Sequence, residues 1–127
     1  ILVNSLLKPL FGRPRPIETI TFGGNVPYVP VWTPSSFCLD NCSFVSGEAS
    51  FGMFMFAFAI VAQPSHRITA SLLAGVFCAT ISINRIAFGA HFLSDVVLAW
   101  LSTALVLLFV HRWLQIKHDL LARHVAE

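Results

Sequence analysis

Charged residues are scarce in this chain. Asp, Glu, Lys and Arg make up 11% of its 127 residues, whereas soluble domains carry about 25%. The eight Lys and Arg residues are scattered and the formal net charge is only +2, so we expect no contiguous basic face of the kind that binds nucleic acid. A nucleic-acid partner is therefore excluded. At this length the chain is expected to form one domain, residues 1–127.

Cysteine is also rare, with Cys38 and Cys42 in a segment rich in Pro and Gly and Cys78 in an apolar run. A lone C-x3-C lacks the second pair of ligands that a structural zinc site requires, and we expect neither a metal ion nor a cofactor. A Cys38–Cys42 disulfide and two free thiols are both compatible with the sequence, since the disulfide requires an oxidising compartment. Cys78 is expected in the protein core.

The chain lacks an initiating methionine and a recognisable signal peptide. Its first seven residues, Ile-Leu-Val-Asn-Ser-Leu-Leu, are typical of the end of an apolar segment. We therefore expect an N-terminally truncated fragment whose missing membrane spans precede residue 1. Without a charged n-region and a small-residue cleavage site, localisation must be inferred from membrane topology.

Long apolar runs are what the chain has in excess. Hydrophobic residues make up 56% of it, against about 45–50% in soluble domains, and they gather in residues 49–62, 68–83 and 92–110. The third run approaches the roughly 20 residues that a membrane-spanning helix needs, while the first, at about 14, also suits a buried or re-entrant helix. We predict an all-α, polytopic membrane helix bundle with about three complete transmembrane helices and the end of a preceding one.

A long segment, residues 17–45, precedes the first apolar run. It contains two adjacent glycines and several prolines and shows no regular hydrophobic period. Loops of this length are usually functional or disordered, and the aromatic residues Tyr28, Trp32 and Phe37 would suit a membrane interface. A lid over a site and a skirt on the membrane surface are both compatible with this composition.

Alternating spans would place residues 8–48 and the turn at 84–91 on one side of the membrane, with Arg67 and the basic tail on the other. Each side carries four Lys and Arg residues. The positive-inside rule decides the orientation only if the four on the first side belong to an active site and are left out of the count. On that assumption the tail is cytoplasmic, and the site lies on the periplasmic or extracytoplasmic face of the inner (plasma) membrane.

Polar residues gather at three ends of the predicted helices, all on this same side. Ionisable groups beside membrane helices are energetically costly, which makes them candidates for function. The three groups are Lys8, Arg13 and Arg15; Ser46, Gly47 and Glu48; and Arg85, His91 and Asp95.

His91 and Asp95 are four residues apart, a spacing that places two side chains one turn apart on the same face of a helix. There Asp95 could accept a hydrogen bond from one ring nitrogen and leave the other free to attack an electrophile. A satisfied structural pair has the same spacing and is the alternative interpretation.

Several residues are suited to binding a phosphate group. Lys8, Arg15 and Arg85 supply positive charge, and arginine offers a planar fork matched to two oxygens. Ser46 is a predicted N-cap, and the free N–H groups of the turn that follows it favour binding of an anion. Gly47 has no side chain, so the backbone could come close to that anion. An ordinary capped helix explains Ser46 and Gly47 as well.

These three blocks resemble the signatures of the type-2 phosphatidic acid phosphatase superfamily, K-x6-RP, PSGH and SR-x5-H-x3-D. Residues 8–16 match the spacing of the first signature, and residues 84–95 match the third except that Asn84 replaces its serine. The second signature departs more, with Val45 in place of proline and Glu48 in place of histidine. Vanadate-dependent haloperoxidases share this signature logic but resemble soluble proteins, unlike this apolar chain.

The resemblance implies a fragment of a larger, six-helix membrane bundle that carries a metal-independent phosphatase site. In that site His91 would attack phosphorus to form a phosphohistidine, and Asp95 would orient His91. The residues implied to bind the phosphate are Lys8, Arg15, Ser46, Gly47 and Arg85.

Glu48 stands where the family's histidine protonates the leaving group. A carboxylic acid can replace that histidine only if its proton is retained near neutral pH, which burial and an adjacent phosphate dianion would favour. Otherwise the step lacks an acid. A diphosphate substrate needs less help, because its leaving group is a stabilised phosphate.

The predicted function is hydrolysis of a lipid phosphate or diphosphate: a phosphorylated glycerolipid, a polyprenyl diphosphate or a lipid A phosphate. A lipid phosphotransferase would instead pass the same phosphohistidine to a hydroxyl group. A catalytically silent phospholipid-binding membrane protein is the third hypothesis, because Glu48 replaces histidine, but the presence of both His91 and Asp95 argues against it. No feature of the sequence indicates an oligomeric state.

Overall fold

The computed structural model describes residues 8–126, and side-chain exposure up to residue 123. The stretch 1–7, predicted to end a preceding span, lies outside the described residues. The helices are α1 (Lys8–Phe11), the 3-10 helices η2 (Pro16–Glu18) and η3 (Ile20–Phe22), α2 (Gly47–Phe54), α3 (Phe56–Val61), the 3-10 helix η4 (Pro64–His66), α4 (Arg67–Ala87) and α5 (Leu93–Ala126). No strand forms within residues 8–126, and the predicted all-α class is confirmed.

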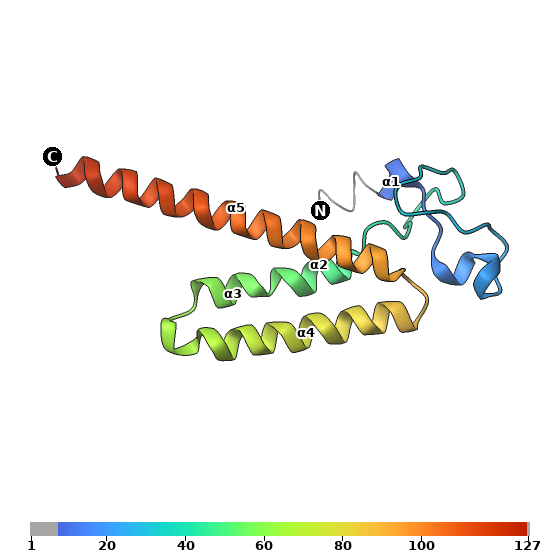
Figure 1. The fold of residues 1–127 in the computed structure, drawn as a ribbon, viewed down its shortest axis with the longest axis horizontal. Helices are drawn as coiled ribbons and strands as arrows, with labels where there is room; N and C mark the ends of the chain where they lie inside the picture. The colour runs from blue at the N-terminus through green and yellow to red at the C-terminus, as the bar shows by residue number, and fades with distance from the viewer. Residues whose placement is uncertain (1–7, 127) are drawn as a thin grey trace.

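Helices α2 and α3 run antiparallel to α4, and α5 returns past α2 (Figure 1). The N-terminal loops and the α4–α5 turn lie at one end of this arrangement, opposite the α3–α4 turn and the C terminus (Figure 1). Backbone hydrogen bonds join the parts at the first end: Ile17 N–H donates to Gly89 C=O (3.1 Å) and Ser43 N–H to Arg13 C=O (2.8 Å). Residues 8–48 and residues 84–91 therefore meet at the same end of the helices.

Two helices of the described chain are long and apolar enough to cross a membrane, Pro64–Ala87 and Leu93–Arg123. In each helix only 17% of the most apolar 18-residue stretch is buried. Most of the apolar surface therefore faces outward, as it does in a helix surrounded by lipid. Gly47–Val61 is a shorter apolar stretch, divided at Met55, whose N–H donates to Gly52 C=O (3.3 Å). These features match a fragment of a helical membrane bundle.

Two helix ends differ from the prediction. Helix α4 extends to Ala87 and includes Asn84 and Arg85, which the sequence had assigned to a turn. Gly89 lies two residues beyond this end, and its φ of +62° is the left-handed conformation that commonly follows a helix. Helix α5 continues from Leu93 through the basic tail to Ala126, because polar residues alone do not end a helix and this stretch contains neither Gly nor Pro.

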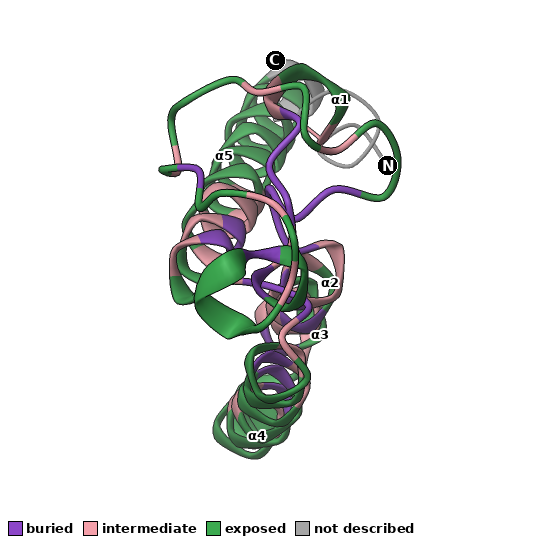
Figure 2. Cartoon of the chain, turned by 90° about the vertical axis from the view of Figure 1, so that its right-hand side faces the viewer, coloured by how far each residue is buried: buried purple, intermediate pink, exposed green. Residues whose placement is uncertain are grey.

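Buried residues gather where the long loop meets α2 and α5 (Figure 2). The ring of Phe44 packs against Phe11 and Trp32, with centroid distances of 4.6 Å and 5.5 Å. The loop is therefore part of the core. The buried apolar cluster consists of Phe44, Val45, Ala49, Val96 and Ala99.

The three cysteines take two roles. Cys38 and Cys42 form a disulfide, with their Cα atoms 5.6 Å apart, so the structure selects one of the two states that the sequence allowed. Cys78 is a buried free thiol, as predicted. It lies where α4 approaches α2 at Gly52, since a Cβ added to Gly52 would be 3.0 Å from the Cys78 Cα.

Candidate active site

His91 lies in the turn between α4 and α5 and is only 1% exposed. Its Nδ1 is 2.7 Å from the carbonyl oxygen of Ser43. Because a carbonyl can only accept, Nδ1 carries the proton and donates it. The other ring nitrogen, Nε2, is 3.3 Å from Oε2 of Glu48. The ring is therefore held through Nδ1, and Nε2 faces the first turn of α2.

Asp95 is fully buried, but it does not orient His91 as the sequence suggested. Its carboxylate forms a close ion pair with Arg13 and accepts hydrogen bonds from the Ser43 hydroxyl (2.6 Å) and the Phe92 N–H (3.0 Å). The one-turn spacing requires both residues on a helix, and α5 begins only at Leu93. Asp95 reaches His91 indirectly, through Ser43, whose carbonyl accepts from the imidazole.

Arg13 is the residue whose role the sequence did not reveal. It is buried, donates through Nε to Val29 C=O (2.9 Å) and through Nη1 to Ser94 Oγ (3.0 Å), and lies over the ring of Phe92, 4.3 Å from its centroid. A buried guanidinium requires a carboxylate partner, and Asp95 satisfies that requirement. The available signal was the presence of both charges in an otherwise apolar chain.

Glu48 lies at the start of α2, between His91 and Arg85. Its Oε1 is 3.6 Å from Nη1 of Arg85. The hydrogen bond to His91, with the charges of His91 and Arg85, lowers the pKa of Glu48 to about 2 even though burial acts in the opposite direction. The carboxyl is therefore ionised at neutral pH. Before substrate binds, Glu48 does not hold the proton that a leaving-group acid would need.

Ser46 caps α2, as predicted. Its hydroxyl accepts from the Ala49 N–H at 3.3 Å, and its own N–H donates to Asp95 C=O at 3.4 Å. The next residue, Gly47, lines a cleft of about 450 Å³ together with Glu48 and Arg85. The cleft therefore joins the helix N-terminus, a carboxylate and a guanidinium beside the buried histidine.

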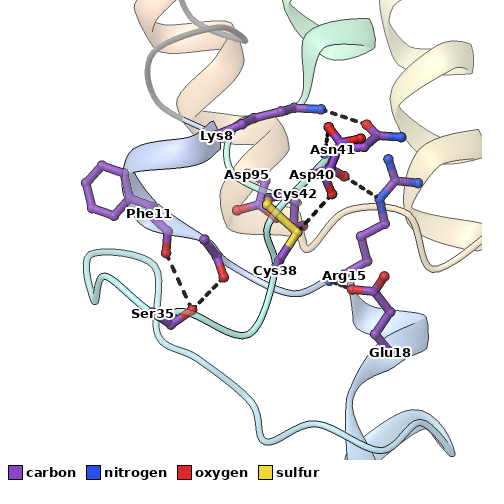
Figure 3. The surroundings of a disulfide bond; sticks show 12 residues. Lys8, Phe11, Arg15, Glu18, Ser35, Cys38, Asp40, Asn41, Cys42 and Asp95 are labelled. Atoms are coloured by element: carbon purple, nitrogen blue, oxygen red, sulfur yellow. Dashed lines mark hydrogen bonds between the residues drawn. A yellow bond between two sulfur atoms is a disulfide. The ribbon is translucent and has the colours of Figure 1, made fainter.

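Lys8 and Arg15 meet at a different residue, Asn41. The Lys8 ammonium donates to Asn41 Oδ1 (3.4 Å) and Arg15 Nε donates to Asn41 C=O (3.0 Å), as Figure 3 shows. Burial lowers the pKa of Lys8, and the charge of Arg15 acts in the same direction, whereas Glu48 opposes it. The predicted phosphate ligands thus form two groups, one at Asn41 and one at the α2–α4 cleft.

An apolar groove of about 560 Å³ borders His91 on another side. It runs between the η2–η3 loop and the α4–α5 turn. Its lining includes Ile17, Phe22, Ile86, Phe88, Phe92 and Leu93. Within the described residues, no three His, Cys, Asp or Glu side chains are arranged to hold a metal ion.

Comparison with known proteins gives a consistent family match. The family model of the PAP2 superfamily matches residues 1–119. A lipid A 4'-phosphatase of Rhizobium leguminosarum is 44% identical over 84% of this chain and 46% of its own length. A second, from Rhizobium etli, is 40% identical over 84% of this chain and 41% of its own length. A third, from Francisella tularensis subsp. novicida, is 36% identical over 88% of this chain and 53% of its own length.

The chain spans about half the length of these curated relatives. No solved structure matches it.

Proposed function

The chain belongs to the type-2 phosphatidic acid phosphatase (PAP2) superfamily, and we propose that it carries the active site of a membrane phosphatase that removes phosphate from a lipid A-type phosphate monoester. The substrate is the one named for the three relatives. The observation that carries the proposal is the buried His91, which is anchored through Nδ1 and whose Nε2 faces Glu48, the carboxylate paired with Arg85.

His91 acts as the nucleophile, without a metal ion. The hydrogen bond from Nδ1 to Ser43 C=O holds the ring so that Nε2 is the reacting nitrogen, as the orienting partner does in other histidine-dependent sites. The phosphate oxygens are bound by Arg85, by the N-terminal turn of α2 at Ser46 and Gly47, and by Lys8 and Arg15.

Glu48 carries the proton. In the resting site the Nε2 proton is donated to the ionised Glu48, 3.3 Å away. When the phosphate dianion enters, its charge raises the proton affinity of the carboxylate, and the proton passes from Nε2 to Oε2. The freed lone pair attacks phosphorus, the bond from phosphorus to the lipid oxygen breaks, and Glu48 protonates that departing oxygen.

Water completes the cycle. It attacks the phosphohistidine while Glu48 accepts one of its protons, the phosphorus–nitrogen bond breaks, and inorganic phosphate leaves. The proton on Glu48 then returns to Nε2. A phosphotransferase would use a lipid hydroxyl in place of water, with the same residues.

Two further features support a lipid substrate outside the cytoplasm. The apolar groove beside His91 suits the hydrophobic part of the substrate, which stays close to the membrane. The Cys38–Cys42 disulfide requires an oxidising compartment, which agrees with an active site on the periplasmic or extracytoplasmic face of the inner membrane.

The test measures phosphate release by the full-length protein in detergent with EDTA, from a lipid A 4'-phosphate, phosphatidic acid and a polyprenyl diphosphate. We expect release from the lipid A phosphate and its loss in His91→Ala. His66→Ala, which changes an exposed histidine in the opposite turn, is the matched control and should keep full activity. Activity that survives His91→Ala, or that EDTA abolishes, would contradict the proposal.

A second arm distinguishes the alternatives. A phosphotransferase would release little phosphate alone and would label an added lipid alcohol. Binding of the phospholipid without release or transfer would identify a silent binder.

A further inference from the structure

The loop closed by the Cys38–Cys42 disulfide lies beside the segment that carries Lys8 and Arg15 (Figure 3). Backbone hydrogen bonds fasten the two segments on either side of the disulfide: Ser35 N–H donates to Phe11 C=O (2.9 Å) and Ser43 N–H to Arg13 C=O (2.8 Å). The disulfide loop is therefore held in a defined place against the basic segment.

Asn41 lies inside this loop and contacts both cations. Its side-chain Oδ1 accepts from the Lys8 ammonium and its backbone carbonyl accepts from Arg15 Nε. Two cations brought together repel each other, and Asn41 offsets this repulsion by accepting from both. One residue thus determines where both positive groups stand.

Each cation keeps donors for another ligand. Arg15 uses Nε on Asn41, which leaves both of its terminal nitrogens, and Lys8 uses one of three donors. Lys8 and Asn41 border a cleft of about 430 Å³, together with Asp40 and others. A phosphate oxygen can therefore be bound without breaking either contact to Asn41.

The backbone of Asn41 has φ of +49°, the left-handed conformation in which asparagine is one of the favoured residues. Its N–H is bonded to the Asp40 carboxylate at 2.8 Å. Without the disulfide this exposed loop would gain conformational freedom, and Asn41 would hold its two partners for a smaller fraction of the time.

We propose that Asn41 is a positioning residue that sets the spacing of Lys8 and Arg15 for a phosphate group, and that the Cys38–Cys42 disulfide makes the affinity of the site for phosphate depend on the redox state. The proposal rests on the assignment of Lys8 and Arg15 as phosphate ligands in the proposed function. It adds a residue outside the three signature blocks.

The experiment measures binding of inorganic phosphate to the full-length protein in detergent by calorimetry, which needs no turnover. Asn41→Gly removes the side-chain acceptor, keeps the backbone carbonyl and suits the positive φ. We expect its Kd to rise about tenfold, the effect of one lost hydrogen bond to a charged group. Asn41→Asp keeps the acceptor and should bind within about threefold of the unaltered protein. Asn25→Gly, at another exposed loop asparagine, is the matched control.

The redox arm uses the Cys38→Ser/Cys42→Ser variant and a phosphine reductant. We expect the reductant to weaken phosphate binding by the unaltered protein to the level of the double variant, and to leave the double variant unchanged. In lipid phosphate hydrolysis, Asn41→Gly should raise KM more than it lowers kcat, because positioning of the ligands affects binding first.

Three results would overturn the inference: no phosphate binding by the unaltered protein, unchanged Kd in Asn41→Gly and the double serine variant, or an equal fall in kcat, affinity and Tm in Asn41→Gly. A different result would contradict the proposed function without contradicting the role of Asn41. If the variants change phosphate binding as expected while the unaltered protein hydrolyses no lipid phosphate, the positioning role stands and the phosphatase assignment does not.

Discussion

Arg13 and Asp95 form a buried ion pair although 82 positions separate them in the chain. The pair joins the segment that follows α1 to the first turn of α5. The Asp95 carboxylate also accepts from the Ser43 hydroxyl, and the Ser43 carbonyl accepts from His91. The ion pair therefore fixes the loop that orients the proposed nucleophile.

Removing Arg13 should destabilise the protein strongly. In Arg13→Met the Asp95 carboxylate stays buried without its cation, and breaking a buried pair in this way costs about 3–5 kcal/mol of unfolding free energy. Unfolding in detergent, followed by circular dichroism during denaturant titration, measures the loss. The double variant Arg13→Met/Asp95→Leu should lose less than the two single changes added together, and strict additivity would show that the pair does not act as a unit.

Ser43→Ala should affect stability more than chemistry. The substitution removes the hydroxyl that donates to Asp95 but keeps the carbonyl that accepts from His91 Nδ1. The Asp95 carboxylate then has one hydrogen-bond donor fewer, and we expect the free energy of unfolding to fall by about 1–3 kcal/mol. We expect kcat to fall by less than about tenfold. Tm and kcat measured on the same preparation check this. A thousandfold fall in kcat at unchanged Tm would mean that the hydroxyl takes part in the reaction.

Glu48→Gln should slow the step in which the lipid leaves. Glutamine keeps the shape of Glu48 but cannot accept or return a proton, so kcat for a phosphate monoester is expected to fall by about 10²–10⁴. The fall should be much smaller for a lipid diphosphate, because its leaving group needs less protonation. Glu48→His, which restores the family's residue, should keep more activity than Glu48→Gln. Equal losses on both substrates would contradict a role of Glu48 in protonating the leaving group.

Substrate binding should weaken at alkaline pH. Burial lowers the pKa of Lys8 from its ordinary 10.5, so the ammonium loses its charge at a lower pH than an exposed lysine does, and the charged form is the one that binds phosphate. KM should therefore rise as pH increases toward 10. In Lys8→Arg, KM should stay flat to higher pH, because a guanidinium keeps its proton. A KM profile that is identical in both proteins would exclude Lys8 as the titrating group.

Gly12 should tolerate no side chain. Its φ is +50°, and an added Cβ would lie 2.0 Å from the Ser35 carbonyl oxygen. Gly12→Ala therefore combines left-handed strain of about 1–2 kcal/mol with a backbone clash, and we expect a clearly lower Tm than the strain alone produces. Gly23→Ala is the matched control, since φ there is +90° but no atom lies within 4 Å of the added Cβ. Similar Tm values for the two variants would contradict the clash.

Much of the fold could be predicted from local properties. The apolar runs predicted the three helical segments because burial in lipid needs only composition and length, and Ser46 was predicted as the cap of α2 because capping depends on neighbouring residues. The helix ends were less accurate. Asn84 and Arg85 continue α4, since a helix end depends on the left-handed Gly89 rather than on polarity.

The gathering of these polar residues at one end of the helices was also predictable, but their contacts were not. His91 and Glu48 meet as a pair, whereas Asp95 binds Arg13 and Ser43 and leaves the orientation of His91 to a backbone carbonyl. Spacing along the chain describes contacts only within one helix, and His91 precedes α5. The role of Asn41 was hidden for the same reason, because it contacts Lys8 33 positions away.

The sequence by itself determined the class of this protein: apolar helices, a family and a set of polar residues gathered toward one end, since these follow from composition, period and motif. Only the tertiary structure decided which charges pair, which nitrogen of His91 faces Glu48, and that Cys38 and Cys42 are joined. Those outcomes depend on a long loop folding back over α2 and α5. Contacts between distant segments are selected by packing and by the need to satisfy every buried charge, and neither can be read from local sequence.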